Sequence, residues 1–334
     1  MPRLLITQGE PSGIGAEVAL KALAEIFVAP DIDFTPVILG DADIIDKMAR
    51  RIGMESAIER IDSIEETRNT RKKIFVLHRA CSGNTRPGFF SPESSGTTID
   101  WIKEAAGLCM EAKAQAMVTG PIDKRSLEIC GRNEPGHTEL LATLTGADSP
   151  MMLLAGKKAR VALLTTHVAL GNVPALIDRP KTLESIQTLN KGLKHDLGIE
   201  SPSIALAGLN PHAGDSGRFG REEIEKLVPA VRDAVAIGVD IKGPFPADTL
   251  FTPSALDRFD AVLACYHDQG LAPLKALEFN TAVNITLNLP IVRTSPSHGP
   301  AYDLADKNSA DPTSMKMAIS LAIEIASRRK SRHP

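Results

Sequence analysis

Three histidines of this chain each follow a short apolar segment. His167 follows VALLT, His212 follows IALAG and His267 follows AVLAC. If these segments are parallel strands, their carboxyl ends meet at one edge of a sheet, where ligands commonly bind. Three neutral imidazoles can hold zinc or another divalent ion and leave one position open for a substrate. The pattern therefore indicates a metal site, although each histidine taken alone is also typical of an ordinary surface or core residue.

A cysteine lies close to the third of these histidines. Cys265 ends an apolar segment, which favours a buried core thiol over a nucleophile. The other cysteines stand far apart and form no CxxC pair, which is typical of a reducing compartment and excludes a cysteine-based zinc motif. These other cysteines are Cys81, Cys109 and Cys130.

Two further stretches carry groups that suit an anion. His137 and Thr138 stand where GHTELLATLTG predicts the start of a helix, and exposed N–H groups at a helix start favour anions. A helix cap formed by Thr138 is the structural alternative. Later polar residues lie among apolar segments, where a cation is costly unless it meets phosphate or carboxylate. These residues are Lys275, Asn284 and Arg293.

The elements that position these groups alternate along the chain. Apolar segments that are typical of buried strands cover residues 4–7, 36–40, 74–77, 116–120, 161–165, 204–208, 261–265 and 283–287. Segments of helical period cover residues 16–27, 41–53, 94–113, 182–198 and 221–238, and a last helix begins at Asp311-Pro312. This alternation predicts an α/β fold with a parallel sheet covered by helices.

Composition sets limits on the class of protein. The chain has 334 residues, of which 43% are hydrophobic and 24% charged, so two domains or lobes are expected. A net charge of -3 argues against nucleic acid as the main partner. The amino-terminal sequence predicts neither a secretory signal nor a membrane span, so we expect a cytoplasmic protein.

The glycine-rich segment GEPSGIG (9–15) follows the first expected strand. It lacks the third glycine of a dinucleotide-binding fingerprint, because Val18 occupies that position, and it lacks the Lys-Ser/Thr ending of a phosphate-binding loop. A tight turn that opens the first helix is the expectation. A nicotinamide cofactor would therefore need another scaffold.

Several longer motifs resemble one enzyme family in order and spacing. They are GEPSGIGAE, TGPIDK, PGHTE, TTHVAL, NPHAG, PADTLF, YHDQGLAPLK and VNITLNLP…RTSPSHGPAYDLA. Together they run from residue 6 to about residue 312 and are similar to the 4-hydroxythreonine-4-phosphate dehydrogenases of pyridoxal phosphate biosynthesis.

The resemblance implies a fold and a reaction. The fold is that of the isocitrate and isopropylmalate dehydrogenases, with two α/β/α lobes around a central cleft. The first lobe would comprise residues 1–130 and 275–334 on the cofactor side, and the second would comprise residues 131–274 on the metal and dimer side. The reaction is NAD- or NADP-dependent oxidation of 4-phosphohydroxy-L-threonine to 2-amino-3-oxo-4-phosphooxybutanoate, which decarboxylates to 3-amino-2-oxopropyl phosphate.

The resemblance also assigns roles to residues. It implies one divalent ion (zinc, cobalt, magnesium or manganese) per subunit on His167, His212 and His267, in an active site shared by a homodimer. It implies substrate contacts from His137, Thr138, Lys275, Asn284 and Arg293. The loop SHGPAYDLADKNSADP (297–312) is similar to the adenosine-binding loop of related dehydrogenases, so its cofactor contacts would be His298, Gly299 and Asp303.

Some alternatives stay open at this stage. A base must take the proton of the substrate hydroxyl, and Lys124 and Asp248 are the candidates, with a structural ion pair or turn as the alternative for both. No single residue of this sequence distinguishes a 4-phosphohydroxy-L-threonine dehydrogenase from relatives that oxidise 4-phospho-D-threonate or D-erythronate. A metal-dependent hydrolase on the same histidines and a non-catalytic binder of phosphate compounds are the remaining hypotheses.

Overall fold

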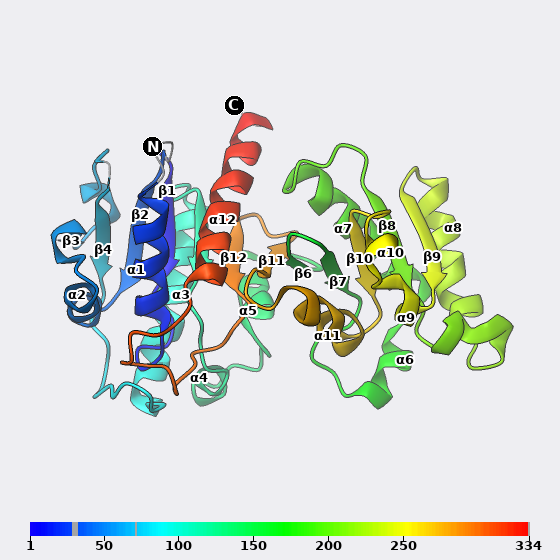
Figure 1. Cartoon of the computed structure of the whole chain (residues 1–334), viewed down its shortest axis with the longest axis horizontal. Coiled ribbons are helices and arrows are strands. Elements are labelled where there is room, and N and C mark those ends of the chain that lie inside the picture. Colours follow the sequence, from blue (N-terminus) through cyan, green and yellow to red (C-terminus); the bar gives the residue numbers. More distant parts are fainter. Residues whose placement is uncertain (29–32, 71, 333–334) are drawn as a thin grey trace. The chain divides into compact units, whose positions relative to one another are not determined.

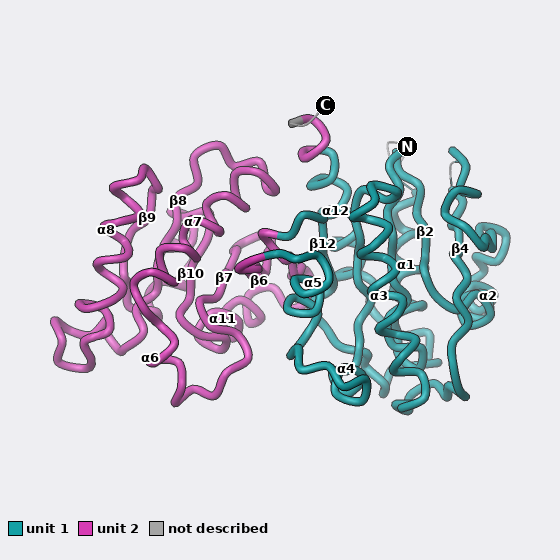
Figure 2. The backbone as a smooth tube through the Cα atoms, turned by 180° about the vertical axis from the view of Figure 1, so that it is seen from behind, with its two compact units in different colours: residues 1–147, 289–327 teal, residues 148–288, 328–334 magenta. Residues whose placement is uncertain are grey.

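A computed structural model describes residues 1–28, 33–70 and 72–332, and the chain divides into two compact units (Figure 1, Figure 2). Unit 1 consists of residues 1–147 and 289–327, and unit 2 of residues 148–288 and 328–334. Both units are α/β structures, which confirms the class that the alternation predicts. The two functional lobes expected from the sequence, residues 1–130 with 275–334 and residues 131–274, stay a prediction.

Unit 1 contains a parallel sheet in the order β3-β4-β2-β1-β5-β12. Its strands are β1 (Arg3–Thr7), β2 (Thr35–Gly40), β3 (Ile58–Ile61), β4 (Ile74–His78), β5 (Ala116–Thr119) and β12 (Arg293–Pro296). In the central strand, Ile6 pairs with Ile38 on one side and Val118 on the other. Strands in this position are buried on both faces, which explains their continuous apolar sequence.

Helices cover both faces of this sheet (Figure 1). Those of unit 1 are α1 (Gly15–Ile26), α2 (Ala42–Arg51), α3 (Ser95–Met110), α4 (Arg125–Ile129), α5 (His137–Thr145) and most of α12 (Thr313–Arg332). Short helical turns are η1 (Glu55–Ala57), η2 (Ile64–Glu66) and η3 (Pro92–Ser94). Trp101 and Ile102 of α3 pack with Leu140 of α5 against strand residues such as Phe75.

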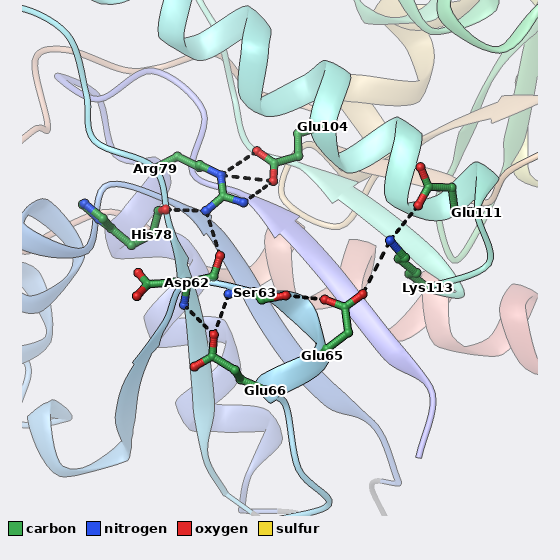
Figure 3. A network of polar contacts seen from close by, with 9 residues as sticks. All are labelled: Asp62, Ser63, Glu65, Glu66, His78, Arg79, Glu104, Glu111 and Lys113. Atoms are coloured by element: carbon green, nitrogen blue, oxygen red, sulfur yellow. Dashed lines mark hydrogen bonds and ion pairs between the residues drawn. The ribbon is translucent and has the colours of Figure 1, made fainter.

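Polar contacts at the end of β4 fix the adjoining segments of unit 1 (Figure 3). The Arg79 guanidinium binds both carboxylate oxygens of Glu104 on α3, at 2.6 to 3.1 Å. The same group donates to the carbonyl oxygens of Asp62, at 3.1 Å, and His78, at 2.7 Å. One side chain therefore ties a strand, a loop and a helix together.

The sheet of unit 2 has the order β11-β6-β7-β10-β8-β9. Its strands are β6 (Met151–Ala155), β7 (Arg160–Leu163), β8 (Ser203–Ala207), β9 (Asp240–Phe245), β10 (Ala261–Ala264) and β11 (Val283–Leu287). Strands β7, β10, β8 and β9 are parallel, whereas β6 is antiparallel to both β7 and β11. The expectation of an entirely parallel sheet is therefore wrong at β6, which runs opposite to both of its neighbours because a tight hairpin connects it to β7.

Helices also cover the sheet of unit 2. They are α6 (Val173–Leu176), α7 (Arg179–His195), α8 (Val228–Ala236), α9 (Ala247–Leu250), α10 (Pro253–Leu256) and α11 (His267–Glu278), with η4 (Leu170–Asn172), η5 (Pro211–Gly217) and the π-helical turn η6 (Glu223–Leu227). Leu271 and Leu274 of α11 pack on Val262 and Val161 of the strands. None of the helices in the described part of the chain is long and apolar enough to cross a lipid bilayer.

Candidate active site

Three adjacent parallel strands of unit 2 lead to the three histidines. Strands β7, β10 and β8 are neighbours, and His167, His267 and His212 follow them in that order. The His167 and His267 ring centroids lie 5.8 Å apart, with the ring planes tilted by 40°. The structure therefore brings these two imidazoles together at the carboxyl end of the sheet, as the strand pattern predicts.

Hydrogen bonds between the strand ends hold this pair of loops in register. The backbone amide and the hydroxyl of Thr165 both donate to the carbonyl oxygen of Cys265, at 3.2 and 2.8 Å. The Cys265 thiol is fully buried and contacts the Ala207 carbonyl oxygen, and burial raises its pKa far above the usual range. Its burial agrees with the core thiol that its sequence position favours.

His212 lies in a different local conformation. Residues 212–216 all have positive φ, and the value for His212 is 53°. Its ring stands 6.1 Å from the ring of Phe219, which is a contact distinct from the His167–His267 pair. Within the described residues of one chain, no group of three or more His, Cys, Asp or Glu side chains is arranged to hold a metal ion. The structure thus pairs two of the three predicted ligands, and it leaves the third on its own loop.

The ring of His267 has a carboxylate partner. Its Nδ1 lies 2.6 Å from Oδ1 of Asp268, the next residue. A carboxylate on Nδ1 favours the tautomer that leaves Nε2 free as an acceptor, which is the usual arrangement behind a metal-binding imidazole. His267 is also the first residue of α11, and it is half-buried, whereas His167 is exposed.

Unit 1 contains a buried cation at the start of β12. The Arg293 side chain is only 2% exposed, and its Nε and Nη2 donate to the Thr119 hydroxyl at 3.2 and 2.8 Å. Burial lowers the pKa of Arg293 to about 9, while the nearby Glu139 carboxylate acts in the opposite direction. The group therefore keeps its charge at neutral pH in a place where a bound anion would stabilise it.

His137 lies close enough to Arg293 to be affected by its charge. Burial, and secondarily the Arg293 charge, hold the pKa of His137 well below its usual value, so the ring is neutral. Although the residue as a whole is partly exposed, its Nε2 is buried and has no hydrogen-bond partner among the described residues. A buried nitrogen of this kind is normally satisfied, so the atom suits a ligand.

The helix that begins at His137 has no side-chain cap. Gly136 is the N-cap of α5, and Thr138 lies inside the helix and is 9% exposed. The alternative that Thr138 caps this helix is therefore wrong. His137 and Thr138 lie in the first turn of α5, where the backbone N–H groups have no carbonyl partner within the helix, which is the geometry expected for an anion site.

Two further predicted substrate residues lie in unit 2. Lys275 is half-buried in the last turns of α11, and it makes no hydrogen bond or ion pair with any residue that the structure describes. Asn284 in β11 has a buried Oδ1 that likewise lacks a partner in the described segments. Both side chains retain unused hydrogen-bonding capacity, which suits contact with a polar ligand.

The two candidate bases are exposed. Lys124 is the N-cap residue of α4, in unit 1, and Asp248 lies in the first turn of α9, in unit 2. Each lies at the start of a short helix, and this placement does not separate the two candidates. Their roles stay predictions.

The proposed cofactor loop packs on the glycine-rich turn of unit 1. The backbone amide of Ile14 donates to the Pro300 carbonyl oxygen at 3.0 Å, and Gly13 approaches Pro300 so closely that a Cβ would lie 2.8 Å from that oxygen. GEPSGIG is thus a tight turn that opens α1, as the sequence predicts. His298 has a buried Nε2 without a partner in the described structure, whereas Gly299 and Asp303 are exposed.

A buried carboxyl in this turn was not singled out from the sequence. Glu10 is 1% exposed, accepts a 3.5 Å contact from the Ser94 hydroxyl, and leaves Oε2 without a partner among the described residues. Burial raises the pKa of Glu10 to about 7, and the Asp123 carboxylate contributes to the rise. Asp123 in turn accepts from the Tyr302 hydroxyl at 3.1 Å. The sequence signal that could have indicated it is an acidic residue, Glu10, placed between Gly9 and Gly13 in the turn.

Comparisons with known proteins agree on one family. Residues 33–322 match the family of pyridoxal phosphate biosynthetic protein PdxA. A 4-hydroxythreonine-4-phosphate dehydrogenase of Geobacter metallireducens is 42% identical over 97% of this chain and 96% of the relative.

Solved structures give the same result for the fold. A 4-hydroxythreonine-4-phosphate dehydrogenase of Klebsiella pneumoniae has a TM-score of 0.82 at 36% identity, over 98% of this chain and 100% of that chain. A terephthalate 1,2-cis-dihydrodiol dehydrogenase of Burkholderia xenovorans is similar with a TM-score of 0.65 at 25% identity, over 97% of this chain and 98% of that chain. The resemblance inferred from the motifs is confirmed, and this chain belongs to the PdxA family of pyridoxal phosphate biosynthetic proteins.

Proposed function

We propose that this chain is a dehydrogenase that oxidises the secondary alcohol of 4-phosphohydroxy-L-threonine with NAD or NADP and a divalent metal ion. The product, 2-amino-3-oxo-4-phosphooxybutanoate, then loses its carboxylate and gives 3-amino-2-oxopropyl phosphate. The family and its dehydrogenase members support this reaction. The observation that carries the metal-dependent part is the pair of imidazoles of His167 and His267, with centroids 5.8 Å apart at the ends of neighbouring strands.

The histidines fit a divalent cation. The carboxylate on Nδ1 of His267 orients the ring, and His167 is exposed on the loop that follows β7. In the proposed enzyme, His212 is the third ligand, and the site is shared by a homodimer in which both subunits supply ligands, as the family resemblance implies. A bound divalent ion supplies Lewis acidity that lowers the pKa of a coordinated hydroxyl and polarises a carbonyl.

The buried groups of unit 1 fit the phosphate. Arg293 carries a desolvated positive charge, which a phosphate dianion would stabilise through charge-assisted hydrogen bonds. The neutral His137 can donate a hydrogen bond from Nε2–H to the same anion without adding a second positive charge. Thr138 and the first amides of α5 add neutral donors.

Lys275 and Asn284 are assigned to the polar groups of the substrate. The unpaired Nζ of Lys275 suits a carboxylate, and the unpaired Oδ1 of Asn284 accepts a hydrogen bond from an amine or a hydroxyl. Lys124 and Asp248 remain the candidates for the base that takes the hydroxyl proton. In this proposal the nicotinamide binds near the loop that holds His298, Gly299 and Asp303, with the unpaired Nε2 of His298 available to it.

A substrate-panel assay tests the proposal. The purified protein is stripped of metal with a chelator, supplied with Zn²⁺, Co²⁺, Mg²⁺ or Mn²⁺, and mixed with NAD or NADP. We expect reduced nicotinamide to form with 4-phosphohydroxy-L-threonine, only when metal is present. In the same assay, His212→Ala is expected to abolish turnover and to retain the fold.

The other outcomes identify the alternatives. Reduced nicotinamide from 4-phospho-D-threonate or D-erythronate alone would replace the amino-acid substrate by a sugar acid. If neither substrate gives reduced nicotinamide but phosphate is released or another bond is hydrolysed, the protein would be a metal-dependent hydrolase. Tight binding of the phosphorylated acids without any reaction would indicate a binding protein. Full activity of His212→Ala would contradict the metal site.

A further inference from the structure

The loop that carries His212 is folded in an unusual backbone conformation. Its residues have φ values of 53° (His212), 51° (Ala213), 83° (Gly214), 43° (Asp215) and 57° (Ser216). Only Gly214 among them lacks a Cβ, and L-residues other than glycine lose roughly 1–2 kcal/mol each in left-handed helical geometry. A run of this kind persists only where the surrounding structure holds it in place.

A buried carboxylate beside the loop stabilises this conformation. Glu223, at the start of the π-helical turn η6, is 2% exposed. Its Oε1 accepts from the backbone amide of Asn210 at 2.7 Å, and its Oε2 accepts from the Asn210 side-chain amide at 3.0 Å. Asn210 is the residue immediately before η5, so both bonds fix the point at which the left-handed run begins.

The same carboxylate packs against the middle of the run. A Cβ added to Gly214 would lie 2.7 Å from Oε2 of Glu223, and one added to Gly208 would lie 3.4 Å from Oε1. Glu223 is thus enclosed between the end of β8 and the turn. A charged group is costly to bury unless it is hydrogen bonded, so the buried Glu223 carboxylate needs its two bonds from Asn210. These bonds in turn hold Asn210, and with it the start of the turn, in place.

We infer that Glu223 is a positioning residue for the metal site: it locks the left-handed turn that presents His212, and so sets the affinity for the cation. The inference rests on the proposed function, because it assumes that His212 is a ligand. Residues that orient metal ligands from behind typically change metal affinity by about 10- to 100-fold when they are substituted.

The test is a Co²⁺ titration of the metal-free full-length protein, followed through the visible absorption bands of bound cobalt. We expect Glu223→Gln to weaken Co²⁺ binding by about 10-fold or more, because the new amide nitrogen cannot accept from Asn210. Turnover of this variant should recover at high Co²⁺ concentration. Glu225→Gln is the matched control, since it makes the same change in the same turn at an exposed residue that pairs with Arg221.

A second variant guards against misfolding of the first. Gly214→Ala leaves Glu223 intact, but it places a methyl group against Oε2 and at a φ of 83°. It should weaken Co²⁺ binding in the same way, while the circular dichroism spectrum and the unfolding transition confirm that each variant is folded. Unchanged Co²⁺ affinity in both folded variants would overturn the role of Glu223.

The His212→Ala variant separates this inference from the function on which it rests. If His212→Ala weakens Co²⁺ binding and Glu223→Gln does not, the metal site stands and the positioning role is wrong. If His212→Ala binds Co²⁺ like the unaltered protein, the metal site itself is wrong, and the inference fails with it.

Discussion

Gln269 joins the ends of two strands through both atoms of its side-chain amide. Its Nε2 donates to the Gly208 carbonyl oxygen, after β8, at 2.6 Å, and its Oε1 accepts from the Cys265 backbone amide, after β10, at 2.7 Å. The strand ends that lead to His212 and His267 are therefore linked by one side chain, although they are far apart in sequence.

Removal of this link should affect both stability and metal binding. Gln269→Leu leaves a backbone amide and a carbonyl unsatisfied, and we expect a loss of about 1–3 kcal/mol in the free energy of unfolding. Metal affinity should fall with it, because the two loops lose their common register. Urea unfolding and Co²⁺ titration measure the two effects. Gln187→Leu, at an exposed position of α7, is the control and should change neither quantity.

Arg293 should determine substrate binding through the geometry of its guanidinium. Arg293→Lys keeps the positive charge but loses the planar fork that contacts the Thr119 hydroxyl and that has the geometry to bind two oxygens of a phosphate. We expect kcat/KM for the phosphorylated substrate to fall by roughly 10- to 100-fold, which corresponds to about 1.4–2.7 kcal/mol. Steady-state kinetics provides the measurement, and inhibition by inorganic phosphate should weaken in parallel. Unaltered kinetics would remove Arg293 from the site.

Glu10 should make the stability of the protein fall as pH rises. Its folded pKa of about 7 lies above the ordinary value of 4.5, so the folded state binds more protons than the unfolded state between these values. The contribution of Glu10 is therefore fully favourable below pH 4.5 and is lost as pH rises through 7, by at most about 1.4 kcal/mol per pH unit.

The variant Glu10→Gln checks this dependence. Relative to the unaltered protein, it should gain free energy of unfolding steadily from pH 4.5 to pH 7 and gain no more above that range. Urea unfolding at a series of pH values measures the difference. A constant difference between the two proteins across this range would show that Glu10 titrates normally in the folded state.

Arg79 should contribute to the stability of unit 1 without affecting the reaction. Arg79→Met removes the bidentate contact with Glu104 and the donors to the Asp62 and His78 carbonyl oxygens (Figure 3). Because the pair is partly solvated, we expect a loss of only about 1 kcal/mol in the free energy of unfolding. Lys103→Met, which removes an exposed pair with Asp100, should change stability less. A fall in kcat would contradict the purely structural role.

The sequence predicts most of the strands, because runs of aliphatic residues mark strands buried on both faces. The segments at 4–7, 36–40, 74–77, 116–120 and 204–208 all fall on strands. Four strands are missed, for two reasons. IERI in β3, DIKGPF in β9 and RTSP in β12 contain polar residues or glycine and proline, so they form no aliphatic run. MMLLA in β6 is apolar, but it consists of residues that favour helices.

The candidate site is also predictable only in part, where the position of a residue follows from a strand end. The position of His167 and His267 at neighbouring strand ends follows from the rule that parallel strands expose their carboxyl ends together. The left-handed turn around His212 does not follow from NPHAG, because it depends on Glu223, whose role is fixed only by tertiary contacts. The buried state of Glu10 is equally invisible, since it arises from segments distant in sequence.

The division of the chain into units has a consequence for the order in which the protein is made. Every strand of unit 2 lies within residues 148–288, so that sheet is complete once this uninterrupted segment has left the ribosome. The sheet of unit 1 must wait for β12, which supplies Arg293, and its covering helix α12 is translated after β12. The strands of unit 1 that precede residue 148 are therefore synthesised before unit 2, but their sheet is completed after it. A nascent chain that stops before residue 293 exposes an incomplete sheet edge to chaperones and aggregation.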